Sequence, residues 1–451
     1  MPLGLRYPYV LLLSVVMQPI DTALLHKDKK LLELTKIPVV TVAASFRQDL
    51  AKYYHMRHIP TEPEVLFSRA HYSMALAALI SAWGDSATRN PKKAWGVDPT
   101  NYVTHHDWSK VEMTQGVGRL MARVPLLKWI KDEIDTKVRN KLPITGAITT
   151  PLLFLFEHID RPILSFHYEA GNILGGIGKK VVQVVTDPHV RDQYLDHAEL
   201  STMRFCVFDK NTKVAFLEKA ATIGKKVDPN RIIITGPPVD PRIVAARKLK
   251  DVTSISKRPL RIVIATGGLG TNKAEIEDCV RSLAPLLRDP HPLLHVIVYV
   301  GVHEDIRESI HAICKQERIP TSIITDEDAT LRILYSPHIV EANEALITYG
   351  FPWADGFITK PSGDMAYDAA AAGCFLLTLQ PWGEWEDNIR DVFEQKEISR
   401  RAIPEKLAEQ MKALISEING KSWIEAAIKH SLDLPELFTH GIKNILAQMP
   451  K

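Results

Sequence analysis

The most constraining feature of this sequence is a series of short, continuous apolar runs rich in β-branched residues. In the first half of the chain these runs are Val10–Val16, Pro38–Ala43, Val65–Ser68, Pro162–Phe166 and Val181–Thr186, and several of them precede helix-like stretches. A parallel strand covered by helices on both faces is uniformly apolar, whereas a half-exposed strand alternates apolar and polar residues. The pattern therefore predicts a parallel α/β sheet.

The same pattern restarts in the second half at Leu260–Ala265. Further strands are predicted at Leu294–Val300, Thr321–Ile324, Gly356–Thr359 and Phe375–Leu379, and helices at Lys273–Leu287 and Glu304–Gln316. Strands and helices that alternate at this spacing predict a second doubly wound parallel sheet. After Pro404 the sequence looks helical to its end, whereas Trp83–Trp108 has no clear period and is expected to be an irregular insertion.

A proline-rich segment, Gly236–Pro241, separates the two halves and is incompatible with a helix or a central strand. We therefore predict an N-terminal domain of residues 1–245 and a C-terminal domain of residues 246–451, with a polar linker at Lys248–Arg258. A chain of 451 residues is about three times a typical domain of roughly 150, which agrees with this division.

Charge is divided unevenly between the two halves. Residues 1–245 carry 32 Lys and Arg against 24 Asp and Glu, while residues 246–451 carry 24 against 29. A basic first half predicts an anionic partner for that domain. Its most basic stretch, Gly118–Lys141, is amphipathic and contains Trp129, which is typical of a helix at an anionic membrane surface and equally of a surface helix packed on a core. No nucleic-acid recognition motif is present, so nucleic acid is not an expected partner.

The cysteines and the first apolar segment bear on location. The four cysteines lie far apart and form no zinc or disulfide pattern, so we expect reduced thiols, no metal site and a cytoplasmic protein. Tyr9–Met17 is apolar, but its nine residues are too few to span ~30 Å of hydrocarbon. No small-residue cleavage site follows it, so we expect a buried strand rather than a signal peptide.

Two glycine-containing turns follow predicted strands of the second half. The first is Gly267-Gly268-Leu269-Gly270-Thr271, and the second, Lys360-Pro361-Ser362-Gly363-Asp364, precedes a helix of small residues. Such turns allow a phosphate to approach backbone amides. For the first turn, a plain structural connection between strand and helix is as good an interpretation, because the G-x-G-x-x-G spacing of a dinucleotide site is absent.

Two further features extend this edge of the predicted sheet. Asp368 lies one turn into the second helix, where a carboxylate could accept hydrogen bonds from ribose hydroxyls or simply favour the helix dipole. A polar loop at Leu379–Asn388 follows the next predicted strand. Three loops at the carboxyl ends of successive parallel strands predict a crevice of the kind that binds nucleotides.

These motifs resemble the nucleotide-sugar motif of the two-domain GT-B glycosyltransferases, and most of all the monogalactosyldiacylglycerol synthase and peptidoglycan N-acetylglucosaminyltransferase type, which act on lipid acceptors. The resemblance implies an α/β protein of two Rossmann-like doubly wound domains that face a central cleft. It implies that the donor is bound by Gly267, Gly268, Gly270, Thr271, Lys360, Ser362, Gly363, Asp364, Asp368, Gly383, Glu386 and Asn388. The family usually has Glu where this chain has Asp368, and Gln where it has Glu384, and Trp385 is an additional aromatic residue.

In the first half, the segment that contains His167, Glu169 and Asn172 is similar to the family's acceptor-side H-E-Q-N sequence, and Val184–His189 is similar to a segment of the galactolipid enzymes. The family's N-terminal glycine loop with its His is represented by Val65–Ala77, which keeps His71 but has no glycine. Inverting sugar transfer needs a base that deprotonates the acceptor hydroxyl. The candidate bases are His71, Asp187 and His189, with Glu169 as a further possibility.

The sequence therefore predicts an inverting glycosyltransferase that moves a sugar from a nucleotide sugar, most plausibly UDP-linked, to a lipid or lipid-linked hydroxyl. The expected protein is cytoplasmic, peripheral at the inner face of the membrane, and uses neither a metal nor a cofactor beyond its nucleotide-sugar donor. Two alternatives stay open at this point. One is a UDP-sugar 2-epimerase of the same architecture, and the other is a non-catalytic protein that binds nucleotide sugar or lipid, which the lost glycines and Asp368 would suit.

Overall fold

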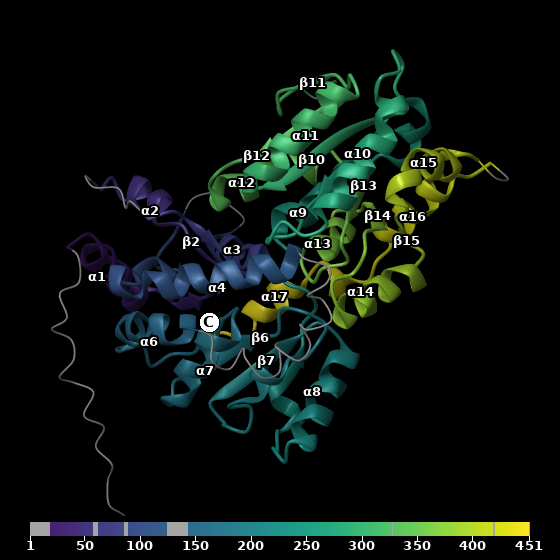
Figure 1. The fold of residues 1–451 in the computed structure, drawn as a ribbon. Coiled ribbons are helices and arrows are strands. Elements are labelled where there is room, and N and C mark those ends of the chain that lie inside the picture. Colours follow the sequence, from purple (N-terminus) through teal and green to yellow (C-terminus); the bar gives the residue numbers. More distant parts are fainter. Residues whose placement is uncertain are drawn as a thin grey trace, which may run out of the picture.

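The computed structural model describes residues 19–56, 62–84, 89–123, 143–326, 328–417 and 420–450. It contains two parallel sheets, each at the centre of an α/β domain (Figure 1). The strands are β1 (Ile37–Val40), β2 (Ala44–Ser45), β3 (Val65–Leu66), β4 (Ala94–Val97), β5 (Ile163–Ser165), β6 (Val181–Val184), β7 (Met203–Val207), β8 (Ile232–Ile234), β9 (Leu260–Ala265), β10 (Leu294–Gly301), β11 (Thr321–Ser322), β12 (Leu331–Tyr335), β13 (Gly356–Thr359), β14 (Phe375–Thr378) and β15 (Ser399–Arg401).

Helices connect these strands and cover the sheets. They are α1 (Pro19–Leu34), α2 (Arg47–Tyr53), α3 (Arg69–Trp83), α4 (His105–Arg123), α6 (Pro143–Phe156), α7 (Tyr168–Gly176), α8 (Lys210–Thr222), α9 (Pro241–Ala245), α10 (Lys273–Leu287), α11 (Glu304–Gln316), α12 (Ile339–Ala345), α13 (Met365–Ala371), α14 (Glu384–Gln395), α15 (Leu407–Ile415), α16 (Trp423–Leu432) and α17 (Gly441–Leu446). In the described ranges, no helix is both long and apolar enough to cross a bilayer.

Both sheets have the strand order of a doubly wound fold. The first sheet runs β4-β1-β5-β6-β7-β8 and the second runs β11-β12-β10-β9-β13-β14-β15, and all pairings within them are parallel. In each sheet the chain first adds strands on one side of the starting strand, β1 or β9. It then crosses to the other side of that strand, where it continues with β5 or β13. Ligands of such sheets bind outside the carboxyl ends of the strands at this reversal. The short β2 and β3 form a separate antiparallel pair.

Most predicted elements occur where the apolar runs placed them, and α10, α11 and β13 have the predicted bounds. The irregular insertion predicted for Trp83–Trp108 is wrong in part, because Ala94–Val97 is the edge strand β4. β7 and β12 were not predicted, because an arginine interrupts the short apolar run of each strand, Arg204 in β7 and Arg332 in β12. The strand predicted at Val10–Val16 lies outside the described residues.

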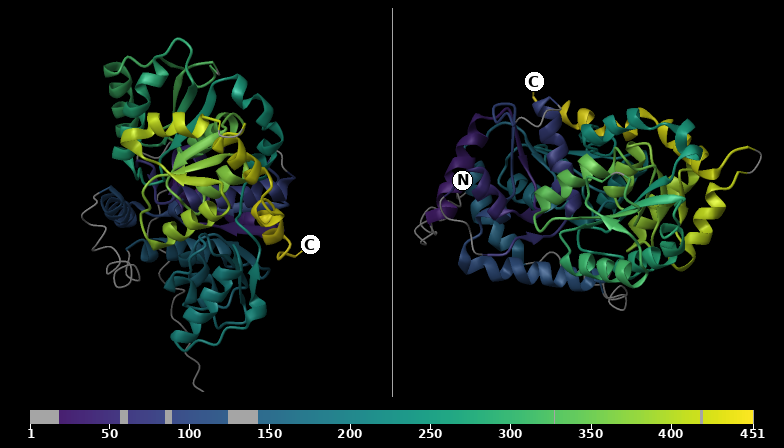
Figure 2. Two further views of the ribbon diagram at one scale, coloured as in Figure 1. Left: turned by 90° about the vertical axis from the view of Figure 1, so that its right-hand side faces the viewer. Right: turned by 90° about the horizontal axis from the view of Figure 1, so that it is seen from above.

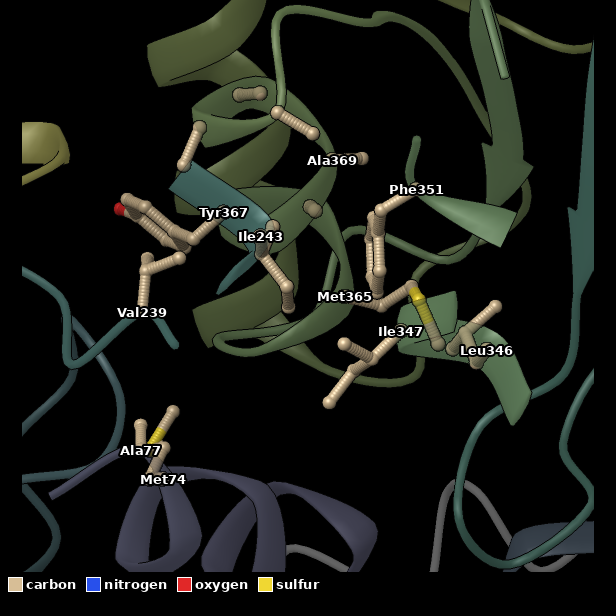
Figure 3. Close-up of a cluster of buried hydrophobic side chains, with 14 of the residues drawn as sticks. Met74, Ala77, Val239, Ile243, Leu346, Ile347, Phe351, Met365, Tyr367 and Ala369 are labelled. Carbon is tan, nitrogen blue, oxygen red and sulfur yellow. The ribbon is translucent and has the colours of Figure 1, made fainter. Parts of the chain in front are cut away.

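The two domains share one apolar core at their interface. Figure 3 shows Met74 and Ala77 of α3 facing α9 and the helices around α13 of the C-terminal half. The buried cluster includes Ile243, Phe351 and Tyr367. Burial of this area stabilises the assembled pair of domains, because apolar area removed from water contributes about 25 cal/mol per Å².

The C-terminal segment returns to the first domain. α17, in yellow in Figures 1 and 2, packs against α3, and Nδ2 of Asn444 donates a hydrogen bond to the carbonyl of Thr235 (2.9 Å). Gly441 lies close enough to Pro237 that a Cβ there would be 1.9 Å from the Pro237 carbonyl oxygen. The C-terminal helix α17 therefore packs on the proline-rich segment that follows β8.

Candidate functional site at the domain interface

The loops that follow the reversal strands of both sheets meet around one cavity of about 270 Å³. The N-terminal domain contributes the segments after β1, β5 and β6 and the start of α3, and the C-terminal domain contributes the loops after β9, β13 and β14. Its polar and aromatic lining includes Arg69, His71, His167, Glu169, Thr186, Asp187, Arg191, Tyr194, Gly267, Gly268, Thr271, Lys360, Ser362, Gly363, Asp364, Trp382, Trp385 and Glu386. Residues from both predicted motif sets therefore face a common space.

The glycine loop after β9 is in direct contact with the N-terminal domain. A Cβ on Gly268 would lie 2.6 Å from the backbone nitrogen of Arg69, and one on Gly267 would lie 2.6 Å from Oγ1 of Thr271. The Gly268 carbonyl is hydrogen-bonded to Nε2 of His303 (3.0 Å). Glycine is needed here because any side chain would separate the loop from its neighbours.

The turn after β13 approaches the N-terminal domain in the same way. A Cβ on Gly363 would lie 2.3 Å from Oδ1 of Asp187 and 2.9 Å from the Thr186 carbonyl oxygen. The Ser362 hydroxyl donates to Oδ1 of Asp364 (2.6 Å) and accepts from the backbone N–H of Met365 (3.2 Å), which fixes the turn at the start of α13. The candidate donor and acceptor sides of the cavity thus touch at Gly363.

A buried ion pair in the lining of the cavity connects the two domains. Nη1 of Arg69 donates to Oδ2 of Asp364 (2.9 Å), and Nη2 lies 3.6 Å from Oδ2 of Asp368. Although burial opposes ionisation, Arg69 and the Ser362 hydroxyl hold the pKa of Asp364 below its usual range. Burial raises the pKa of Asp368 to about 8 despite the same arginine. The negative charge beside Arg69 is therefore concentrated on Asp364, and burial favours the protonated form of Asp368.

Asp368 does not line the cavity, although the resemblance implies a role for it in donor binding. Its side chain is only 8% exposed and is directed to Arg69. Gly270, Gly383 and Asn388, from the same set, also stand outside the lining, and Asn388 is exposed on α14. The structure brings the other donor-side residues of the set together at the cavity.

The loop after β14 adds an aromatic wall. Nζ of Lys360 forms an ion pair with Oε1 of Glu386, whose other oxygen accepts from the backbone N–H of Trp382 (2.6 Å). The rings of Trp382 and Trp385 meet edge to face at 6.0 Å, and the Arg191 guanidinium lies 5.0 Å from the centre of the Trp385 ring. The indoles therefore span from the donor loops to the N-terminal domain.

On the N-terminal side, His71 joins three elements. Its Nε2 is hydrogen-bonded to Oγ1 of Thr186 (3.0 Å), which is also hydrogen-bonded to the Tyr194 hydroxyl (3.1 Å). Its ring meets the ring of His167 edge to face at 4.8 Å, and the His167 ring stacks on Tyr168 at 4.4 Å. Ser68 fixes the first turn of α3 by accepting from the backbone N–H of His71 (3.3 Å).

Asp187 lines the same cavity, one residue after Thr186. Its pKa is raised to about 6, mainly by burial and also by the nearby Glu386 and Asp364 carboxylates, although Arg191, whose Nη2 lies 3.6 Å away, lowers it. A carboxylate with a pKa near the working pH can both accept and release a proton. His189, two residues later, does not line the cavity and lies beside Trp385, with ring centres 6.1 Å apart.

The two other acceptor-side predictions have different positions. Glu169 lines the cavity, accepts a hydrogen bond from Oγ1 of Thr145 (3.1 Å), and has its pKa raised by burial. Asn172 stands outside the lining and donates from Nδ2 to the carbonyl oxygen of Gln193 (2.8 Å) and to Asp196 (3.2 Å). Asn172 therefore supports the loop after β6 and does not face the cavity.

Sequence reasoning missed several lining residues, above all Arg69, Thr186, Arg191, Tyr194 and Trp382. Arg69 stands two residues before His71, so its charge next to a candidate base was a visible signal. Thr186 and Arg191 flank Asp187 in the same segment. Nothing in the sequence indicated that Tyr194, from a 3₁₀ turn, would contact Thr186, because that contact depends on the path of the loop.

A separate cluster joins the domains away from the cavity. Nδ1 of His338 lies 3.0 Å from Oε2 of Glu64 and 3.9 Å from Oδ1 of Asp49. In the ranges that the structure describes, these three side chains form the cluster whose possible metal-ligand atoms all lie within 4.8 Å of one another. Glu64 and Asp49 raise the pKa of His338, although burial opposes this, so the cluster acts as an ion pair between α2 and the start of α12.

No protein-family model matches this sequence, and no curated protein matches it by sequence. Solved structures do match the fold. A UDP-GlcNAc 2-epimerase from Neisseria meningitidis bound to UDP-GlcNAc has a TM-score of 0.50 and 10% identity, over 91% of this chain and 100% of that chain. S. aureus MnaA in a co-structure with UDP has a TM-score of 0.49 and 11% identity, over 92% of this chain and 99% of that chain. Acinetobacter baumannii MurG has a TM-score of 0.47 and 13% identity, over 91% of this chain and 100% of that chain. Together with the two parallel sheets, the similarity shows that this chain has the GT-B fold, as the sequence predicted.

Proposed function

We propose that this protein is an inverting glycosyltransferase that moves a sugar from a nucleotide sugar, most plausibly UDP-linked, to a lipid or lipid-linked hydroxyl. The observation that carries the proposal is the convergence of Gly267, Gly268 and the Ser362–Gly363 turn with His71 and Asp187 on one cavity. Such a transfer requires a nucleotide-binding loop and a base near one reacting centre, because the sugar carbon and the acceptor hydroxyl must be held next to each other.

On the donor side, the diphosphate would lie against the glycine loop and the Ser362–Gly363 turn, which both line the cavity. Thr271 and Lys360 line the same part of the cavity. Leaving-group departure needs stabilisation of the developing negative charge, which side-chain cations supply in this proposal without a metal ion. Asp364, Asp368, Glu386, Gly270, Gly383 and Asn388 would shape this side or contact the nucleotide.

On the acceptor side, His71 and Asp187 are the proposed bases, and the hydrogen bond between His71 and Thr186 orients His71. Glu169 and His167 would contact the acceptor. A single base in line with the reacting carbon suits inversion, because the acceptor oxygen attacks from the face opposite the leaving group. His189 and Asn172 contribute indirectly in this proposal, since neither faces the cavity.

A lipid acceptor agrees with the apolar surface beside the cavity. Val117 of α4 lines the cavity and is 44% exposed, and Met113, one turn earlier on the same face, is 56% exposed. Apolar side chains in this position would contact the hydrocarbon part of an acceptor. We propose a cytoplasmic location at the inner face of the membrane. The basic segment Gly118–Lys141 would face anionic lipid in this proposal, and its residues 124–141 lie outside the described residues.

The experiment that tests the proposal combines binding and turnover. Nucleotides and their sugar conjugates are titrated by calorimetry, and the preferred UDP-sugar is then incubated with short-chain lipid acceptors while UDP release and glycolipid are measured. Stoichiometric glycolipid and UDP support transfer. Release of UDP and a free sugar with inverted configuration at C2 from UDP-N-acetylglucosamine without acceptor would instead identify a 2-epimerase. Binding without turnover would identify a non-catalytic binding protein, and no binding would overturn the proposal.

A further inference from the structure

Arg69 is a buried arginine whose hydrogen-bonding capacity is largely unused. Its side chain is 2% exposed and lines the cavity. Nη1 donates to Asp364, and the other polar side chains next to the guanidinium are Tyr299 and Asp368, whose Oδ2 lies 3.6 Å from Nη2. Among the described residues, none of these neighbours gives Nε or Nη2 a hydrogen bond of good geometry. A guanidinium has five donors in a planar fork, and burying donors without partners costs free energy. Arg69 is therefore incompletely satisfied by the two aspartates.

The position of Arg69 is beside the loop where the proposed function places a diphosphate. Its backbone nitrogen is so close to Gly268 that a Cβ there would be 2.6 Å away. Arginine binds phosphate oxygens through two parallel hydrogen bonds, a geometry that a distant carboxylate does not supply. Although it belongs to the N-terminal domain, Arg69 is thus within the donor side of the cavity.

Carboxylates already neutralise the cations that line the cavity. Arg69 pairs with Asp364, Lys360 with Glu386 and Arg191 with Asp187. An incoming dianion must therefore compete with a carboxylate for any of them. The Arg69 pair is the one with buried unsatisfied donors, so it gains most from a new partner.

We propose that Arg69 exchanges partners when a nucleotide diphosphate enters the cavity. Its guanidinium leaves the Asp364 and Asp368 side chains and binds the diphosphate. Asp364 is then an internal competitor of the ligand, and Arg69 is the N-terminal domain's binding residue for the donor. This inference rests on the proposed function and adds to it how the two domains respond to the donor.

The test measures the affinities of UDP and inorganic pyrophosphate for the full chain by calorimetry at fixed ionic strength. We expect Arg69→Gln to weaken both ligands about tenfold or more, because charge-assisted hydrogen bonds are lost. Arg69→Lys should recover only part of the affinity, since a single ammonium cannot form the planar fork. Asp364→Asn should bind both ligands more tightly than the unmodified chain, because the competing charge is removed.

The matched control is Arg47→Gln, since Arg47 is an equally buried arginine of the same domain, paired with Glu62 and outside the cavity. It should lower the melting temperature without changing either affinity. Unchanged affinity in Arg69→Gln, or weaker binding in Asp364→Asn, would overturn the inference while leaving the proposed function standing. If Arg69→Gln fails to fold, Asp364→Asn decides alone. If the unmodified chain binds neither ligand, the proposed function and the inference both fail.

Discussion

Nε2 of His71 lies 3.0 Å from Oγ1 of Thr186, and this hydrogen bond connects the first turn of α3 to the segment after β6. Thr186 is itself held by the Tyr194 hydroxyl, which is 3.2 Å from its backbone nitrogen and 3.1 Å from its Oγ1. A base that is oriented in this way loses less freedom when it acts, because its ring is already in place. The arrangement makes the role of His71 testable apart from its role in folding.

His71→Gln should lower the turnover number by ~10²–10⁴-fold if His71 is the general base, with the donor affinity unchanged. Thr186→Val, which removes the hydroxyl but keeps the shape, should lower turnover less and leave the fold intact. Steady-state kinetics with UDP-sugar and a lipid acceptor measures both. His106→Gln is the control, since His106 is 89% exposed and away from the cavity. Full activity in His71→Gln would remove His71 from the mechanism.

The activity should depend on the ionisation of Asp187, whose pKa burial raises to about 6. As a base it must be deprotonated, so kcat/KM should fall as the pH decreases through about 6. Arg191 lowers this pKa, so Arg191→Gln should move the acidic limb of the profile to higher pH. A pH–rate profile of the two proteins measures the shift. An acidic limb that stays in place in Arg191→Gln would mean that another group controls it.

Asp368 and Asp364 should affect stability in opposite directions. Burial raises the pKa of Asp368 to about 8, so its protonated form favours the folded state. The stability it allows is greatest below the unfolded pKa of ~3.9 and is lost as the pH rises through about 8. An asparagine cannot ionise, so Asp368→Asn should avoid the loss of folding free energy at high pH. We expect a higher melting temperature at pH 8, by about 2–4 °C for each kcal/mol of folding free energy regained, and a smaller increase at pH 5.

Asp364→Asn provides the contrast in the same measurement. The folded state holds the Asp364 pKa below its usual range, so its ionised form stabilises the fold above the unfolded pKa and the effect is lost as the pH falls. We expect Asp364→Asn to lower the melting temperature at pH 7 and to have little effect near pH 3. Melting curves at pH 3, 5, 7 and 8 separate the two variants. Equal behaviour of both would contradict the assignment of charge to Asp364.

Gly363→Ala should separate the two sides of the cavity. Its Cβ would be 2.3 Å from Oδ1 of Asp187 and 2.9 Å from a backbone oxygen, and only the first of these atoms can move at low cost. Overpacking of this kind costs about 1–3 kcal/mol, so we expect a lower melting temperature together with a loss of turnover. Gly146→Ala, where a Cβ meets nothing within 4 Å, is the control and should be neutral or slightly stabilising. Unchanged turnover in Gly363→Ala would show that the contact is not needed for activity.

The sequence determined the architecture and part of the site. Continuous apolar runs such as Leu260–Ala265 identify parallel strands, because only strands buried on both faces lack alternation. The glycine loop and the Ser362–Gly363 turn were predicted to lie at one sheet edge, since parallel strands bring their carboxyl ends together, and the structure places both on the cavity. The conformation of these turns depends on residues that are neighbours in the sequence, so the sequence alone can predict it.

Only the tertiary structure decided what crosses the interface. Arg69 and Asp364 are 295 positions apart in the sequence, and no local pattern indicates that they would form a buried ion pair. Asp368 lies next to the same arginine and does not line the cavity, although the resemblance of its motif had implied a donor contact. The pKa values of Asp187 and Asp368 also depend on burial between domains, a property of the assembled fold. Pairings between distant segments are set by the packing of the two domains as a whole, which short-range patterns do not encode.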